Sequence, residues 1–450
     1  MNNFSNDIFG NWQGKISVSG IELKISAQFL KDKSSRLVGS MDIISQGAKD
    51  IGLDQLVLDD NNVSFKLKGI TGDPSFEGKI EGQQITGKYS QSSVFGTFEL
   101  ARGKAVVELR PQTPKPPFDY LIEELQFKGE TDLLSGTLTH PKSKEIPPLV
   151  ILVSGSGPQD RDETILNHKP FAVLADFLTK SGIAVFRYDD RGVARSKGDF
   201  SKANTLNFAN DARGAVNYFL KRKDIDTQNI GMIGHSEGAS IVSMLAADLE
   251  PKLSFIVMMA GMGVNGHKVL SFQRKQLHIN KGVDLKIHYG NEKIFDGALP
   301  LIQSSASEAD FVKSLTPMTL DYTAIFKKEF GQDMDAKNYL QSIYVALANP
   351  WMKFFLTFEP SKYLKKVKIP VLVMNGTLDQ QVDIDLNLPS IKESFKEANN
   401  SHVQYELIDG VNHLFQTAKT GAVSEYSTIE ETISPKVLAI LKKWILKQTK

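Results

Sequence analysis

The chain has 450 residues, enough for about three domains, and its 41% hydrophobic and 23% charged residues are ordinary for a globular protein. Its 53 basic and 52 acidic side chains give a formal net charge of +1, which argues against a nucleic-acid-binding protein because such proteins usually carry a basic excess. The absence of cysteine excludes disulfides, thiolate metal sites and a cysteine nucleophile.

The N-terminal segment and the apolar runs of the chain bear on localisation. The first residues contain no basic segment followed by an apolar one, so we expect no secretory signal in this chain and a cytoplasmic protein by default. A periplasmic or secreted protein whose leader has been trimmed would show the same sequence. No run approaches the ~18 apolar residues that a membrane span needs, so we expect no integral membrane segment.

Residues 1–104 are predicted to form a small all-β domain, a lipocalin-like barrel or a sandwich. Short segments there alternate polar and apolar side chains, and turn signals separate them at a spacing typical of such folds. Gly10-Asn11-Trp12 resembles the opening of lipocalin-like barrels, and a Trp12 that simply fills the core is the plainer interpretation. The expected strands are 15–18, 22–29, 63–67, 76–80, 85–89 and 94–100.

A proline-rich linker is expected over residues 105–120, because the segment 111–117 carries prolines that keep a chain stiff and extended. From 121 to 450, continuous apolar runs alternate with helical segments, which predicts a parallel sheet covered on both faces. The stretch of about 264–362 is polar and helix-prone, and we interpret it as a helical cap above the strand ends. The expected strands are 124–127, 134–138, 149–153, 183–188, 230–233, 255–259, 371–374 and 405–408.

The motif Gly234-His235-Ser236-Glu237-Gly238 lies between an apolar strand and an apolar helix. This is the context of a nucleophile elbow, and the helix N-terminus behind Ser236 favours an oxyanion. A serine becomes a good nucleophile when a base takes its proton and a third group orients that base. Asp379 and His413 follow later strands in the order serine, acid, histidine, so the sequence predicts a Ser236–Asp379–His413 triad.

An oxyanion hole needs two backbone N–H donors. One is expected from Glu237, the residue after the nucleophile, and the other from the loop that follows strand 149–153. That loop begins Ser154-Gly-Ser-Gly-Pro158, and its glycines let the backbone approach a substrate oxygen. We expect the Ser156 amide to be the second donor, with the Gly157 amide as the alternative.

These motifs, with the segments 188–196 and 376–379, resemble those of α/β-hydrolase-fold serine esterases. More narrowly, residues 121–448 are similar to bacterial carboxylesterases that carry an N-terminal β-domain. The resemblance implies a carboxylic-ester hydrolase that acts on a small-molecule ester through the triad, without a cofactor. Ala194 departs from the pattern, since many members have glycine there, and this puts the geometry of that turn in doubt. The chain lacks a His-x-x-x-His pair, so no metal site is expected.

Two other functions remain open from the sequence. A serine aminopeptidase or an acyl-CoA thioesterase would use the same triad, and a binding protein would use the β-domain to capture a ligand or partner. The cap aromatics Trp351, Phe355 and Tyr322 are candidates for lining an acyl pocket, although cap core is the plainer role of each. Acyl-chain specificity and homo-oligomerisation are not determined by the sequence.

Several charged and apolar side chains outside the triad have structural interpretations. The charged residues of segments 160–162 and 189–191 are expected to form ion pairs that hold the loops near the nucleophile. The Glu237 side chain either influences His413 or contacts water or the cap. The helix near the C-terminus has an apolar stripe that includes Trp444, and we expect it to pack on the sheet rather than bind a membrane surface.

Overall fold

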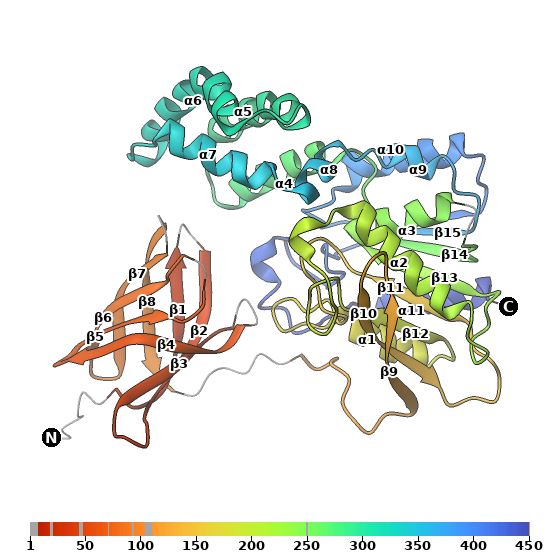
Figure 1. Ribbon diagram of the computed structural model, residues 1–450, viewed down its shortest axis with the longest axis horizontal. Coiled ribbons are helices and arrows are strands. Elements are labelled where there is room, and N and C mark those ends of the chain that lie inside the picture. The colour runs from red at the N-terminus through yellow and green to blue at the C-terminus, as the bar shows by residue number, and fades with distance from the viewer. Residues whose placement is uncertain are drawn as a thin grey trace. The chain divides into compact units, whose positions relative to one another are not determined.

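The computed structural model describes residues 8–18, 21–44, 48–70, 72–91, 94–103, 110–248 and 251–449. The chain divides into two compact units (Figure 1). Unit 1 comprises Met1–Pro111 with the short segments Thr164–His168 and Tyr426–Glu430, and unit 2 comprises the remainder. Within unit 1, the Arg110 guanidinium donates hydrogen bonds to the carbonyls of Leu166 and Ser427.

The N-terminal part of unit 1 is a closed antiparallel barrel, because β1 pairs with β2 on one side and with β8 on the other. The predicted all-β domain is therefore a barrel and not a sandwich. The sequence did not predict β3 and β4, whose pairing contains register shifts that break the alternation of a regular strand. The strands are β1 (Gly10–Val18), β2 (Ile21–Lys31), β3 (Leu37–Ile43), β4 (Ala48–Asp59), β5 (Asn62–Leu67), β6 (Ser75–Glu81), β7 (Gln84–Gln91) and β8 (Val94–Arg102).

Aromatic side chains fill the inside of the barrel. Phe65 and Phe76 stack with ring centroids 4.7 Å apart, and Phe98 meets the Phe76 ring edge-on at 5.1 Å. Trp12 is fully buried, its indole N–H donates to the Ile8 carbonyl at 2.7 Å, and it belongs to this core as expected. Burial of such large rings supplies much of the hydrophobic stabilisation of a small barrel.

Unit 2 is built on an eight-stranded sheet in the order β16-β15-β14-β13-β11-β12-β10-β9. β9 and β10 pair antiparallel, β10 is antiparallel to β12, and the remaining neighbours are parallel. This order and direction confirm the predicted α/β-hydrolase fold. The strands are β9 (Tyr120–Lys128), β10 (Leu133–Pro141), β11 (Leu149–Val153), β12 (Ala184–Tyr188), β13 (Ile230–His235), β14 (Phe255–Met259), β15 (Val371–Gly376) and β16 (Val403–Ile408).

Helices cover both faces of this sheet (Figure 1). One face packs against α2 (Thr205–Phe219), α3 (Glu237–Ala247) and α10 (Ile384–Glu397), and the other against α1 (Pro170–Thr179) and α11 (Pro435–Gln448). The α11 stripe lies in the core as predicted, with the Trp444 ring edge-on to Phe255 at 5.6 Å. The β11, β13, β14 and β15 residues are all buried, which explains why these strands are continuous apolar runs.

A group of helices interrupts the alternation between β14 and β15, in the stretch predicted to be a cap. The cap has its own hydrophobic cluster, separate from the two clusters that flank the sheet. Its buried residues include Ile294, Phe311 and Leu340. The cap helices are α4 (Gly266–Asn280), α5 (Leu285–Gln303), α6 (Glu308–Phe330), α7 (Ala336–Leu347) and α8 (Pro350–Thr357), and the short α9 (Ser361–Leu364) leads back to the sheet. In the described part of the chain, every helix is too short or too polar to cross a membrane.

From the packing of α11 we predict how much stability Trp444 contributes. Trp444→Ala is expected to lower the free energy of unfolding of unit 2 by about 3–5 kcal/mol, because it leaves a cavity against Phe255. Scanning calorimetry measures this without relying on tryptophan fluorescence. The control is Lys443→Ala on the exposed side of the same helix, which should have little effect. Equal losses in the two variants would contradict the packing argument.

Candidate active site

The loop between β13 and α3 is a tight turn that carries Ser236. A Cβ placed on Gly234 would lie 2.1 Å from the Gly238 carbonyl oxygen, and one on Gly238 would lie 2.2 Å from the Val153 carbonyl oxygen. Only glycine fits either position. Ser236 has φ 53° and ψ −115°, a conformation that costs a residue with a side chain about 1–3 kcal/mol. Its side chain is therefore presented, partly exposed, at the carboxyl end of the sheet.

Asp379 and His413 follow β15 and β16 at the same edge of the sheet. The His413 Nδ1 lies 2.9 Å from Asp379 Oδ2, and both residues are buried. The other carboxylate oxygen of Asp379 accepts the backbone N–H groups of Gln381 and Val382, each at 2.8 Å. Because Nδ1 faces a carboxylate that accepts, it carries the proton, and Nε2 is left as the basic nitrogen.

His235 brings the His413 loop to the elbow. Its Nε2 lies 3.0 Å from the His413 carbonyl oxygen, and the two imidazole rings lie 4.9 Å apart. Since His235 immediately precedes Ser236, the predicted serine and histidine belong to one small region. The structure thus gathers Ser236, His413 and Asp379 from three loops far apart in the sequence.

The loop after β11 lies directly against Ser236. A Cβ on Gly155 would be only 3.3 Å from the Ser236 Cβ. The Gly155 N–H already donates to Glu163 Oε1 at 2.7 Å, so it is not available to a substrate. The next amides along the loop belong to Ser156, which is exposed, and to Gly157, which has φ +93°. The Glu237 amide lies in the first turn of α3, where N–H groups lack intrahelical acceptors.

Ion pairs hold this loop, as the sequence suggested. Arg161 contacts Asp189 with its Nη2 at 2.7 Å and its Nε at 3.0 Å. Asp162 pairs with the Arg187 Nε at 2.8 Å. Asp189 is buried and both arginines are largely shielded, so these pairs are less screened by water than surface pairs are. The charged residues in the loop after β11 therefore have a structural role.

Asp190 and the turn that follows it complete the support of the loop. The carboxyl of Asp190, a half-buried residue, accepts hydrogen bonds from the Ser154 hydroxyl at 3.1 Å and the backbone N–H of Gln159 at 3.0 Å. Burial raises the pKa of Asp190 well above its ordinary value. Ala194 has φ 46°, the left-handed region that favours glycine, so the turn forms with alanine at a cost of roughly 1–2 kcal/mol.

The cap meets the elbow through one of its three candidate aromatics. The Trp351 indole N–H donates to both carboxylate oxygens of Glu237, at 2.8 and 3.0 Å, and the indole stacks on Phe355 at 4.9 Å. Tyr322 instead packs inside the cap core, with its ring 5.7 Å from that of Tyr339. Tyr322 is thus not brought to the elbow, because helix α6 turns that face toward the other cap helices.

The Glu237 carboxyl is buried between the elbow and the cap. It also accepts a hydrogen bond from the Thr205 hydroxyl at 2.6 Å. Burial raises the pKa of Glu237 above its ordinary value, and the hydrogen bonds from Thr205 and Trp351 oppose that rise. Of the interpretations that the sequence left open for this side chain, the structure shows the contact with the cap.

Two residues of this region were missed by the sequence analysis, namely Glu163 and His235. Both are buried, and His235 Nδ1 lies 2.9 Å from Glu163 Oε1. Their 72-residue separation in the chain hides the contact from any local pattern. The one available signal was a histidine next to the nucleophile, at a position where the elbow motif accepts any residue.

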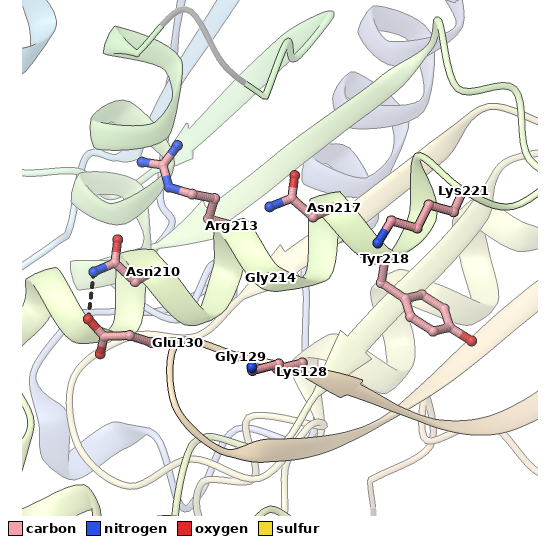
Figure 2. Close-up of a pocket in the computed structure, with 9 residues that line it drawn as sticks. All are labelled: Lys128, Gly129, Glu130, Asn210, Arg213, Gly214, Asn217, Tyr218 and Lys221. Atoms are coloured by element: carbon pink, nitrogen blue, oxygen red, sulfur yellow. Dashed lines mark hydrogen bonds between the residues drawn. The ribbon is translucent and has the colours of Figure 1, made fainter.

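A groove of about 430 Å³ lies elsewhere in unit 2, along α2 and the end of β9 (Figure 2). Lys128, Gly214 and Lys221 are among its lining residues, and Glu130 on its rim accepts a hydrogen bond from Asn210 at 2.8 Å. None of the predicted site residues lines it. Within the described ranges, no three histidine, aspartate or glutamate side chains gather in a way that could hold a metal ion.

Comparison with known proteins adds family information to this geometry. The profile of a family described as X-Pro dipeptidyl-peptidase (S15 family) matches residues 109–388. The esterase EstD of Thermotoga maritima is 25% identical over 316 residues, which are 70% of this chain and 66% of that protein. An acyl transferase of Vibrio campbellii is 31% identical over 171 residues, which are 32% of this chain and 54% of that protein. The chain therefore spans less than two thirds of the length of both curated relatives.

A solved structure is also similar in part. The esterase Pf2001 of Pyrococcus furiosus aligns over 74% of this chain and 92% of its own. The sequence identity is 14% and the TM-score is 0.44.

Burial of the Glu237 carboxyl leads us to predict how the stability of the fold depends on pH. Because its folded-state pKa is raised above the ordinary 4.5, the folded protein binds more protons than the unfolded one in the range just above that value. Ionisation of Glu237 therefore destabilises the fold as the pH rises. Glu237→Gln, which stays neutral, is expected to gain stability relative to the wild type across that range, by at most about 1.4 kcal/mol per pH unit. Urea denaturation at stepped pH measures the difference, and a difference that does not vary with pH would contradict the prediction.

Proposed function

This chain belongs to the X-Pro dipeptidyl-peptidase (S15) family, and on that basis we propose that it is a serine hydrolase that cleaves carboxylic esters through Ser236. The observation that carries the proposal is the Asp379–His413 hydrogen bond at 2.9 Å beside a strained serine elbow. The family match over residues 109–388 and the α/β sheet of unit 2 support a hydrolase. The similarity to the Thermotoga esterase supports an ester.

The proposed reaction proceeds through an acyl-enzyme. His413 Nε2 takes the proton of the Ser236 hydroxyl, and the oxygen attacks the ester carbonyl. The negative charge that develops on the carbonyl oxygen is stabilised by the Ser156 and Glu237 amides, with Gly157 as the alternative donor. His413 then gives its proton to the leaving alcohol. A water molecule, deprotonated by His413, releases the acid and restores the serine.

Asp379 is proposed to hold His413 in the productive tautomer. The Gln381 and Val382 amides hold one oxygen of this carboxylate, while the other accepts the Nδ1 proton of His413. The carboxylate cannot rotate away without losing these bonds. It also stabilises the imidazolium that forms when His413 accepts the serine proton.

Trp351 and Phe355 are proposed to border the acyl site. Their stacked rings belong to helix α8, and the indole N–H of Trp351 is bonded to the residue that follows the nucleophile. An apolar wall at this position suits an acyl chain. The cap core location of Tyr322 gives no support to its proposed substrate contact.

A peptidase is the second candidate, because the family name describes a dipeptidyl-peptidase. Such an enzyme has to bind a free amino terminus, and a buried ammonium needs an acidic partner. The acidic side chains near Ser236 already have hydrogen-bond partners. Glu237 accepts from Thr205 and Trp351. Glu163 contacts Gly155 and His235. This favours an uncharged ester over a peptide with a free amino terminus.

The binding-protein alternative depends on the barrel. A ligand carrier of this type needs an open interior, whereas Phe65 and Phe76 stack in the middle of this one and are almost fully buried. The packed interior therefore favours an enzyme whose chemistry lies in unit 2.

Ser236→Ala is expected to lower kcat for p-nitrophenyl esters by about 10⁴-fold or more, because no other group forms the acyl-enzyme. The measurement compares both proteins on acyl chains from acetyl to palmitoyl, and the preferred chain length reports the size of the pocket. An Ala-Pro p-nitroanilide and an acyl-CoA are assayed beside the esters. Turnover of the anilide alone would replace the ester proposal by the peptidase, and serine-independent ester turnover would refute both.

Asp379→Asn should preserve the fold and lower kcat by about 10⁴-fold, because an amide in place of the carboxylate allows the wrong His413 tautomer. The matched control is Asp409→Asn, which changes an exposed acid in the loop after β16. Steady-state kinetics on the best ester measure both. Similar activity in the two variants would remove Asp379 from the proposed triad.

A further inference from the structure

Two buried residues without a role in the proposed reaction connect the loops on either side of Ser236. Glu163 belongs to the loop after β11, and its Oε1 accepts the Gly155 N–H at 2.7 Å. The same oxygen lies 2.9 Å from His235 Nδ1. His235 Nε2 in turn lies 3.0 Å from the His413 carbonyl oxygen. A continuous chain of contacts therefore runs from the oxyanion loop, behind the nucleophile, to the loop of the proposed base.

The acceptor atoms in this series of contacts indicate which ring nitrogens of His235 carry a proton. A carbonyl oxygen only accepts, so His235 Nε2 carries a hydrogen. Glu163 Oε1 accepts from the Gly155 amide, and an ionised carboxylate oxygen at that position also accepts from Nδ1. Donation from both ring nitrogens is the arrangement of an imidazolium beside a carboxylate. Both residues are at least nine-tenths buried, so water does not replace these bonds.

The charges around His235 favour this assignment. Burial lowers the pKa of His235, but the Glu163 carboxylate and the bond to the His413 carbonyl outweigh it, and the net pKa is raised. Asp379 acts in the same direction from beyond His413, whose ring lies 4.9 Å away. Burial and the nearby Glu163 both raise the pKa of Asp190, which favours its neutral form and leaves Glu163 as the counter-ion of His235.

We propose that Glu163 and His235 form a positioning pair, in which an imidazolium and a carboxylate hold the oxyanion loop and the His413 loop in fixed positions on either side of Ser236. The inference rests on the proposed function and assigns this region two residues beyond the triad. Neither residue reacts with the substrate. They act through the Gly155 amide, which sets the position of the Ser156 amide, and through the His413 backbone.

The pair makes the site sensitive to alkaline pH. A histidine whose folded-state pKa is raised stabilises the fold below its unfolded pKa, and this contribution is lost as the pH rises through the folded pKa. When His235 loses its Nδ1 proton, a lone pair faces the Glu163 carboxylate and the link between the loops is broken. We expect kcat to fall on the alkaline side, with KM little changed, because the link positions reacting groups rather than binding the acyl chain.

Glu163→Gln tests the charge with little change of shape. The glutamine oxygen accepts the Gly155 N–H, and the imidazolium then has no counter-ion. His235 therefore loses a proton and one of its bonds. The expected result is a 10- to 100-fold fall in kcat at neutral pH and an alkaline limb displaced to lower pH. Glu145→Gln, at an exposed position, is the matched control and should leave both unchanged.

Two substitutions separate the two ends of His235. The amide nitrogen of His235→Asn reaches the position of Nδ1 and keeps the bond to Glu163, whereas that of His235→Gln reaches the position of Nε2 and keeps the bond to His413. Each variant retains one of the two bonds of His235. In both, we expect kcat to fall, and we expect the alkaline decrease of kcat that His235 produces to disappear. His402→Asn, at an exposed histidine, controls for the substitution itself. Unchanged kcat and pH profile in all the pair variants would overturn the positioning role while leaving the esterase proposal standing.

Nitrogen NMR of histidine in the Ser236→Ala protein tests the pair without any activity. Two protonated ring nitrogens on His235 at pH 7 are expected, and one unprotonated nitrogen would overturn the inference. Amide hydrogen exchange of residues 154–163 and 410–415 should accelerate in Glu163→Gln, and unchanged exchange would also overturn it. If the wild type cleaves no ester, the proposed function fails, and these two measurements still decide whether the pair exists and holds the loops.

Discussion

The active-site region depends on the close approach of the elbow backbone to itself and to β11. Gly234 packs against the Gly238 carbonyl, and Gly238 packs against the Val153 carbonyl, at distances that exclude any side chain. The turn that results holds Ser236 at a positive φ, and the Ser236 amide donates to the Met259 carbonyl at 2.8 Å. The turn brings together Ser236, the first turn of α3 and the loop after β11.

The acidic side chains of the region connect neighbouring elements. Asp379 contacts the ring of His413, Glu163 joins Gly155 of the loop after β11 to His235, and Glu237 accepts the hydrogen bond of the Trp351 indole of the cap. Each carboxyl is buried and has at least two hydrogen-bond donors, which a buried carboxyl requires because it has lost its water. The site thus combines a sheet edge with polar contacts to a cap that has its own hydrophobic core.

Much of the fold could be predicted because local patterns report burial. The strands β11, β13, β14 and β15 are buried on both faces and are recognisable as apolar runs, and their order along the chain leads to the parallel sheet. Strands β3 and β4 were missed because bulges interrupt their alternation. Tyr322 illustrates the other limit: an aromatic residue in a cap helix faces either the pocket or the cap core, and only the packing of α6 shows that it is the core.

By itself, the sequence determined the class of the fold, the elbow, and the order in which a serine, an acid and a histidine follow three strands. These features are local, because glycine spacing and strand ends are visible in short segments. Only the tertiary structure decided that Glu163 contacts His235, that the Glu237 carboxyl accepts a hydrogen bond from the cap, and that Trp351 is the aromatic residue that reaches the elbow. Each of these contacts joins residues 72 or more positions apart, and their geometry is set by how helices and loops pack on the sheet rather than by any local pattern.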